Sequence, residues 1–117
     1  MVTEIACFRA QPGKGDALAD GLARGLKVIQ GAEGCLSAKL CRCVEDDQVY
    51  IYMIEWETLA HHIDTFRNGP LFAQYRSHIA GLFVEPVDVN HYETIQEERV
   101  VSGSPASWVR RCRRRTT

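Results

Sequence analysis

Aromatic and ionisable residues gather in the middle of the chain, in types and at spacings that could act on a small organic molecule. Trp56 ends an apolar run, His62 follows it closely, and Arg76 lies further along. Aromatic rings commonly line small-molecule pockets. An imidazole, with an unperturbed pKa of about 6.5, suits proton transfer near neutral pH, and a guanidinium binds anions. We therefore expect catalytic roles for Trp56, His62 and Arg76.

Aromatic residues on neighbouring elements are expected to bind the substrate in the same pocket; they are Tyr52, Phe66, Phe72 and Tyr75. Each candidate also has a purely structural interpretation. Trp56 and the two tyrosines could be packing residues, His62 a hydrogen-bonded core histidine, and Arg76 a partner in a surface salt bridge.

Residues 48–67 must position most of these side chains, and they read as a β-strand that leads directly into a short helix. Alternation with period two places Tyr52 and Trp56 on one strand face and Ile51 and Met53 on the other. Thr58 is a plausible N-cap. Beyond it an apolar helical stripe includes a histidine: Leu59, His62, Ile63 and Phe66.

The rest of the chain supplies three more strands and two more helices. We predict strands at residues 2–9, 35–44 and 87–95, and helices at 16–30 and, after Asn68-Gly69-Pro70, at about 71–82. Gly21 and Gly25, four residues apart in the first helix, could let it approach a neighbouring backbone closely. The predicted order is β-α-β-β-α-α-β. It gives an α+β, ferredoxin-like fold with an antiparallel four-stranded sheet.

Such a sheet carries helices on one face only, yet its third strand is apolar on both faces. Val49, Ile51 and Met53 need a cover that the chain itself does not supply. Two-fold pairing is the commonest solution. We therefore expect a homodimer formed through the open sheet face.

Composition limits the function classes. Residues 1–96 are expected to form one domain, and residues 97–117 a polar, arginine-rich tail, which we expect to be flexible. Five of the 14 basic residues lie at 110–115, so the body is acidic, which argues against specific nucleic-acid binding. The sequence shows neither a membrane span nor a signal-peptide pattern, so we expect a cytoplasmic protein without membrane contact.

The five cysteines do not form a C-x-x-C pair. Cys35, Cys41 and Cys43 share parity on one predicted strand, which makes a metal cluster worth considering. Cysteines that pack as small buried hydrophobes in a reducing compartment are the more usual case. We expect neither a metal site nor a bound cofactor.

Several segments, taken together, resemble the antibiotic biosynthesis monooxygenase (ABM) domain over about residues 2–95. They are FRAQPGK from Phe8, AEGC from Ala32, EWE from Glu55, AH at residues 60–61 and PVDVNHY from Pro86. The resemblance implies a dimeric α+β barrel. Its oxygenases use molecular oxygen as co-substrate without a metal or organic cofactor: a phenol or quinol loses a proton, its anion reduces dioxygen, and the radicals recombine on the way to a quinone.

The resemblance also assigns positions. Trp56 and Arg76 match a tryptophan and an arginine of the polyketide quinol-forming members, whereas Tyr52 and His62 replace an asparagine and a tyrosine. Both replacements exchange protons or hydrogen-bond. The haem-degrading members carry a histidine on the third helix at the position of Tyr75 or Arg76, and His78 of this chain is displaced from that position.

We expect a cofactor-independent monooxygenase that oxidises a small aromatic phenol or quinol to a quinone with dioxygen. The alternatives are a non-catalytic dimeric module that binds haem or a small apolar ligand, and a redox-neutral polyketide cyclase or isomerase.

Overall fold

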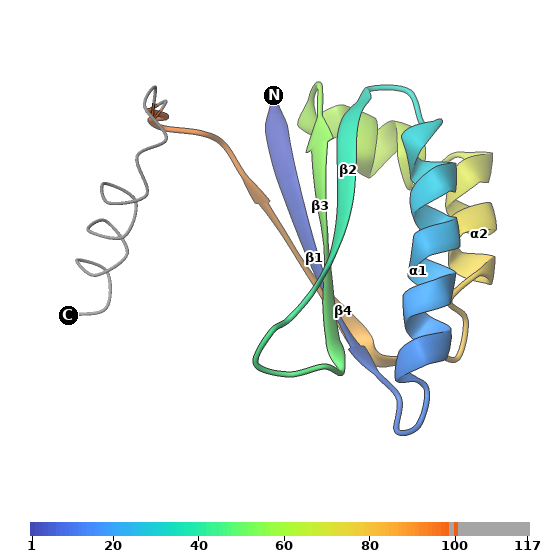
Figure 1. The fold of residues 1–117 in the computed structure, drawn as a ribbon. Helices are drawn as coiled ribbons and strands as arrows, with labels where there is room; N and C mark the ends of the chain where they lie inside the picture. The colour runs from blue at the N-terminus through green and yellow to red at the C-terminus, as the bar shows by residue number, and fades with distance from the viewer. Residues whose placement is uncertain (99, 101–117) are drawn as a thin grey trace.

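The computed structural model describes residues 1–98 and 100 of the chain, and it is built on one antiparallel sheet (Figure 1). Strand β1 (Val2–Ala10) leads to helix α1 (Gly15–Gln30), then to β2 (Cys35–Arg42) and β3 (Val49–Trp56). The π-helical turn η1 (His61–Phe66), helix α2 (Pro70–Ser77) and strand β4 (Phe83–Tyr92) follow. The strand order is β2-β3-β1-β4, and all neighbouring pairs are antiparallel. The predicted ferredoxin-like α+β fold is therefore confirmed.

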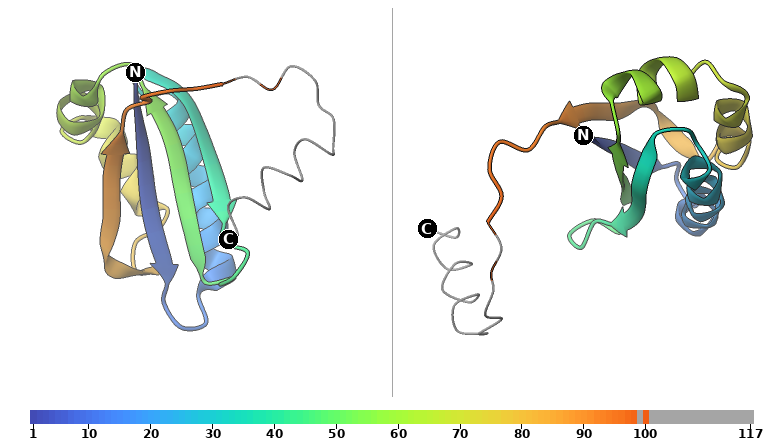
Figure 2. Two further views of the ribbon diagram at one scale, coloured as in Figure 1. Left: turned by 90° about the vertical axis from the view of Figure 1, so that its left-hand side faces the viewer. Right: turned by 90° about the horizontal axis from the view of Figure 1, so that it is seen from above.

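The helices cover one face of the sheet, and no other described element covers the opposite face (Figures 1 and 2). The alternation predicted for β3 is confirmed, since Tyr50, Tyr52, Ile54 and Trp56 are buried and the residues between them are half-buried. The two largest fully buried side chains of β3, Trp56 and Tyr52, form the core with Phe8 of β1 and with apolar residues of α1. Among the described residues, every helix is too short or too polar to cross a bilayer.

Helix α1 packs against α2 at the two glycines that its sequence singled out. A Cβ atom on Gly21 would run into the backbone carbonyl of His78. One on Gly25 would lie 2.9 Å from the Tyr75 ring and 3.0 Å from the Tyr52 hydroxyl oxygen. The expected close approach to a neighbouring backbone is therefore present at Gly21. Each glycine loses roughly 1 kcal/mol of helix propensity against alanine. The close packing of α1 against α2 offsets this loss.

Four element boundaries differ from the prediction. Strand β2 ends at Arg42, short of residue 44, and α2 ends at Ser77, so Ile79 and Leu82 lie in the connection to β4. Strand β4 ends at Tyr92, short of residue 95. It begins at Phe83 and includes Pro86, which we expected to stand before the strand. Proline is tolerated there because β4 is an edge strand, and its pairing with β1 is irregular between Cys7 and Arg9. The predicted tail lies mostly outside the described residues.

The segment after Trp56 folds as a π-helical turn. The Thr58 hydroxyl accepts a hydrogen bond from the His61 backbone N–H at 3.2 Å, so the predicted cap is present. The Arg67 N–H donates to the His62 carbonyl at 3.1 Å, five residues back. This wide turn brings His62 and Phe66 to the buried side of the segment, with Arg67 next to them.

Candidate active site

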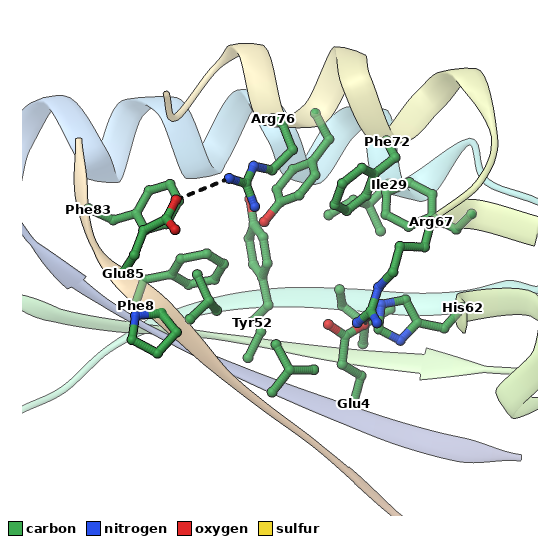
Figure 3. Close-up of a pocket in the computed structure, with 17 residues that line it drawn as sticks. Glu4, Phe8, Ile29, Tyr52, His62, Arg67, Phe72, Arg76, Phe83 and Glu85 are labelled. Atoms are coloured by element: carbon green, nitrogen blue, oxygen red, sulfur yellow. Dashed lines mark ion pairs between the residues drawn. The ribbon is translucent and has the colours of Figure 1, made fainter. Parts of the chain in front are cut away.

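A cavity of about 250 Å³ lies between the inner sheet face and the helical layer (Figure 3). Strand β1 contributes Glu4, Ala6 and Phe8 to it, and β3 contributes Tyr52 and Ile54. The remaining walls come from α1, η1, α2 and β4: Ile29, His62, Phe66, Arg67, Phe72, Tyr75, Arg76, Phe83, Glu85, Pro86, Val87 and Val89. The walls are mainly aromatic and aliphatic, with charged groups toward both ends.

One end of the cavity is built around a buried carboxylate, Glu4, which is 5% exposed. The Trp56 indole N–H donates a hydrogen bond of 2.9 Å to Glu4 Oε1. The same oxygen lies 3.4 Å from His62 Nε2. The other imidazole nitrogen, His62 Nδ1, lies 2.7 Å from His91 Nε2. Four side chains from β1, β3, η1 and β4 thus form one polar array, joined by two hydrogen bonds and by the 3.4 Å contact between Glu4 and His62.

Trp56 supports this array from behind. It is 0% exposed and does not line the cavity. Its indole stacks on the His62 imidazole, with ring centroids 5.2 Å apart and an interplanar angle of 13°. Our expectation that Trp56 would line the pocket was therefore wrong, because the inward row of β3 is buried beneath η1 at its end.

Burial dominates the electrostatics of this end. It raises the pKa of Glu4, although the Trp56 hydrogen bond and the nearby Arg67 charge act in the opposite direction. Burial also lowers the pKa of His62 to about 4, with additional repulsion from Arg67 and His91. His62 is consequently neutral at neutral pH. Burial and the Arg67 charge lower the pKa of His91 as well.

The opposite end of the cavity carries Arg76 of α2 and Glu85 of β4, joined by an ion pair of 3.5 Å (Figure 3). The Arg76 guanidinium also lies over two aromatic rings, 5.2 Å from the Phe83 centroid and 5.9 Å from the Phe72 centroid. Both charged groups are partly solvated, so the pair contributes little to stability. Arg76 is therefore available to an anionic or electron-rich group of a ligand.

The two tyrosines of the cavity are held as neutral phenols. The Tyr52 hydroxyl donates to the backbone carbonyl of Leu22 in α1. Burial is the main cause that raises the pKa of both Tyr52 and Tyr75 far above neutral pH. They shape the cavity and do not act as proton acceptors.

Six of the seven residues predicted to form the site line this one cavity: His62, Arg76, Tyr52, Tyr75, Phe66 and Phe72. Sequence reasoning missed Glu4, Arg67 and His91. His91 lies on the inner face, directly opposite Glu4 in the β1–β4 register. One signal was available for Glu4, since it shares strand parity with the inward-facing Ala6 and Phe8.

The residue beside His62 has a separate role. His61 is half-buried, and its Nδ1 lies 2.8 Å from the Thr58 hydroxyl. Its ring covers Gly34, whose φ of +83° favours glycine. His61 therefore holds the connection before β2 and does not belong to the cavity.

Metal-ligating side chains do not cluster in the described part of the chain. Within residues 1–98 and 100, His, Cys, Asp and Glu form no group of three or more that could hold a metal ion. Cys7, Cys35, Cys41 and Cys43 are free thiols. The groups available for chemistry in the cavity are thus acids, bases and hydrogen-bond donors.

Comparison with known proteins places this chain in a family. The model of the antibiotic biosynthesis monooxygenase family matches residues 1–77. The crystal structure of a candidate antibiotic biosynthesis monooxygenase from Bordetella bronchiseptica is 30% identical, with a TM-score of 0.76, over 81% of this chain and 97% of that one. YczJ, an uncharacterized Bacillus subtilis protein, is 24% identical over 95 residues, which are 81% of this chain and all of that protein.

A more distant structure shares the fold. SnoaB, a cofactor-independent oxygenase from Streptomyces nogalater, is 17% identical with a TM-score of 0.71, covering 82% of this chain and 94% of SnoaB. The family model matches more than half of this chain, and the Bordetella protein resembles the chain in sequence and fold. This chain therefore belongs to the antibiotic biosynthesis monooxygenase family.

Proposed function

We propose that this protein is a cofactor-independent monooxygenase that converts a small aromatic phenol or quinol into a quinone with dioxygen. The observation that carries the proposal is the aromatic cavity with the buried Glu4–His62 pair at one end. A flat, electron-rich ring fits between aromatic walls, and its hydroxyl would meet an acid–base pair. The cavity, at about 250 Å³, is smaller than most ligand pockets, which are roughly 300–1,000 Å³, and this favours a substrate of few rings.

The reaction starts when the phenol O–H gives its proton to the Glu4–His62 pair. The phenolate then transfers one electron to dioxygen, and the two radicals recombine at a ring carbon that bears hydrogen. The resulting peroxide loses water: the O–O and C–H bonds break and a second C=O bond forms. One atom of dioxygen enters the quinone and the other leaves as water, so atoms and electrons balance without another reductant.

The protein's part in this reaction is binding, proton transfer and exclusion of water. Apolar walls strengthen the electrostatic interactions inside the cavity. Arg76, at the opposite end, would stabilise negative charge that spreads through the ring system. Each ring nitrogen of His62 already faces another side chain, so His62 acts together with Glu4. Trp56 fixes both members of the pair.

A dimer would complete the fold. Ile5, Ile51 and Met53 are half-buried on the sheet face that the helices leave open. This apolar face would pair with the same face of a second copy, which supports the homodimer expected from the sequence. The cavity lies on the opposite side of the sheet, so each subunit would carry its own site.

Oxygen uptake tests the proposed function. Purified, chelator-treated protein is mixed with anthrone, with menadiol and with haem in an oxygen electrode, and the products are followed by absorbance. Uptake with a phenol or quinol, above its rate of autoxidation and proportional to enzyme concentration, supports the proposal. Haem binding with a shifted Soret band and no phenol-dependent uptake would instead favour the ligand-binding alternative.

A further inference from the structure

We propose that Glu4 is the catalytic base of this site: its Oε2 atom takes the proton of the bound phenol, Trp56 and His62 position it, and His91 connects it to solvent. This assignment rests on the proposed function and deepens it by naming the reacting atom. It also requires that the ligand carry an ionisable hydroxyl at the end of the cavity away from Arg76.

The two carboxylate oxygens of Glu4 have different surroundings. Oε1 accepts from Trp56 and faces His62 Nε2. No described residue donates a hydrogen bond to Oε2, and no fully buried side-chain oxygen or nitrogen in the described residues lacks a partner. Oε2 therefore remains accessible from the cavity, and Figure 3 shows the carboxyl group at the cavity wall next to His62 and Arg67.

An ionised carboxylate only accepts hydrogen bonds, so Glu4 is the acceptor of this array. Indole N–H is only a donor, so Trp56 donates to Oε1. In the His62 tautomer that carries its hydrogen on Nε2, this N–H faces Oε1 at 3.4 Å, and Nδ1 accepts from the Nε2–H of His91. In this tautomer the hydrogens point toward Glu4. His91 is half-buried on the edge strand β4, where it can exchange protons with solvent.

A purely structural role explains this arrangement poorly. Burying a carboxylate costs free energy, and an apolar residue at position 4 would continue the inward row of Ala6 and Phe8 at no such cost. Ionisable groups with shifted pKa values that line a cavity are typical of functional sites. Burial raises the pKa of Glu4, which makes its carboxylate a stronger base than one in water.

The charged and titratable groups around Glu4 come from several elements. His62 and Arg67 approach from η1 and the residue after it, His91 from β4, and Cys35 from β2. Tyr52 and Tyr75 line the adjacent cavity as neutral phenols. Arg67 is the positive charge of this group and favours the ionised form of Glu4.

The proton step is balanced within the site. The phenol O–H bond breaks, an Oε2–H bond forms, and the negative charge moves from Glu4 to the phenolate oxygen. No electron is transferred to or from dioxygen in this step. Glu4 later returns to the carboxylate when its proton passes to the peroxide oxygen that leaves as water. The proton can also reach solvent through His62 and His91 once both imidazoles take the other tautomer, in which His62 Nε2 accepts and His62 Nδ1–H donates to His91 Nε2.

Glu4→Gln tests the assignment, because it keeps the side chain's shape and an acceptor for Trp56 while it removes the base. With anthrone as substrate, which carries a phenol hydroxyl in its tautomer anthranol, we expect kcat to fall by about 100-fold or more and KM to change little. The wild-type rate should rise with pH as Glu4 ionises, and this acid limb should vanish in the variant. Glu57→Gln, the same change at an exposed residue next to Trp56, should behave as wild type.

Equal kcat values and unchanged acid limbs for Glu4→Gln and wild type would overturn the assignment and leave the oxygenase function standing. If Glu4→Gln does not fold, Glu4→Asp replaces it. We expect Glu4→Asp to be slower and to retain the acid limb, because the carboxylate remains but is drawn back from the cavity. Wild-type-like kcat in Glu4→Asp, together with a wild-type profile that has no acid limb, would also overturn it.

A binding measurement tests Glu4 as the partner of the phenol hydroxyl independently of the oxygenase activity. Dissociation constants are measured without turnover for 1-naphthol and for 1-methoxynaphthalene, which lacks the hydroxyl hydrogen. We expect wild type to prefer 1-naphthol by about fivefold or more, and Glu4→Gln to lose most of that preference, because hydrogen bonds to charged groups are roughly twice as strong as neutral ones. This result without oxygen uptake would refute the proposed function and keep the phenol site; equal affinities in wild type would refute Glu4 as the phenol's partner.

His91 acts only through His62, so its test needs a readout beyond rate loss. We expect His91→Ala to slow turnover in dilute buffer and added imidazole to restore it, because imidazole can carry the proton to solvent. Turnover that is slow and insensitive to imidazole would show a structural role and remove His91 from the proton path.

Discussion

The hydrogen bond between Trp56 and Glu4 gives the sharpest structural prediction. Trp56→Phe keeps an aromatic ring in a fully buried position but deletes the indole N–H that lies 2.9 Å from Glu4 Oε1. A hydrogen bond to a charged group contributes about 1.5–3 kcal/mol. The space left by the smaller ring adds about 1–2 kcal/mol. The free energy of unfolding should therefore fall by about 2.5–5 kcal/mol.

A double-mutant cycle isolates the hydrogen bond from the cavity. Wild type, Trp56→Phe, Glu4→Gln and the double variant are unfolded in urea at pH 7 and followed by far-ultraviolet circular dichroism. Because the amide oxygen in the Glu4→Gln variant still accepts a neutral hydrogen bond, the coupling energy should be about 1 kcal/mol, the difference between charged and neutral bonds. The same cycle with Glu57→Gln should be additive. Additivity within about 0.5 kcal/mol in the Glu4 cycle would refute the inferred interaction.

Three further predictions concern pH, packing and assembly. The lowered pKa of His62, about 4, means that the unfolded chain binds the proton first, so stability should fall from pH 6.5 toward pH 4 by up to about 3 kcal/mol. His62→Gln should lose this pH dependence of stability in urea titrations, and an unchanged dependence would contradict the lowered pKa of His62. In wild type, the raised pKa of Glu4 acts in the opposite direction. Gly21→Ala should lower the free energy of unfolding by about 2 kcal/mol or more, because its Cβ would strike a backbone carbonyl, whereas Gly31→Ala, with ordinary clearance, should lie within about 0.5 kcal/mol of wild type. Ile51→Arg on the open sheet face should give a monomer in sedimentation velocity while Val44→Arg, at a 93% exposed position, leaves a dimer; a monomeric wild type would refute the dimer.

Local patterns were sufficient to predict most of the fold. The alternation in β3 and the apolar stripe of α1 each follow from burial on one face, which is a property of a single segment. Pro86 was misread because proline usually interrupts a strand, and only the strand order reveals that β4 is an edge. The π-helical form of η1 also escaped prediction, since it covers only six residues, too few to show a period in the sequence.

The site was predicted less completely, for a physical reason. Tyr52, His62 and Tyr75 could be found because each stands on the apolar side of its own element. Glu4 and His91 become partners only through the β1–β4 register, which joins residues from opposite ends of the domain. A charged residue within a short alternating strand looks like a surface position until its neighbours across the sheet are known.

Isotopically labelled dioxygen tests the central claim most directly. Chelator-treated protein turns over anthrone under labelled dioxygen in unlabelled water, and mass spectrometry follows the quinone. The mechanism predicts one labelled oxygen atom per quinone formed by the enzyme, with dioxygen and quinone in equal amounts and a rate that depends on Glu4. Quinone formed at the rate of autoxidation, or enzymatic product without label, would contradict the proposal that this cavity is a cofactor-independent monooxygenase site.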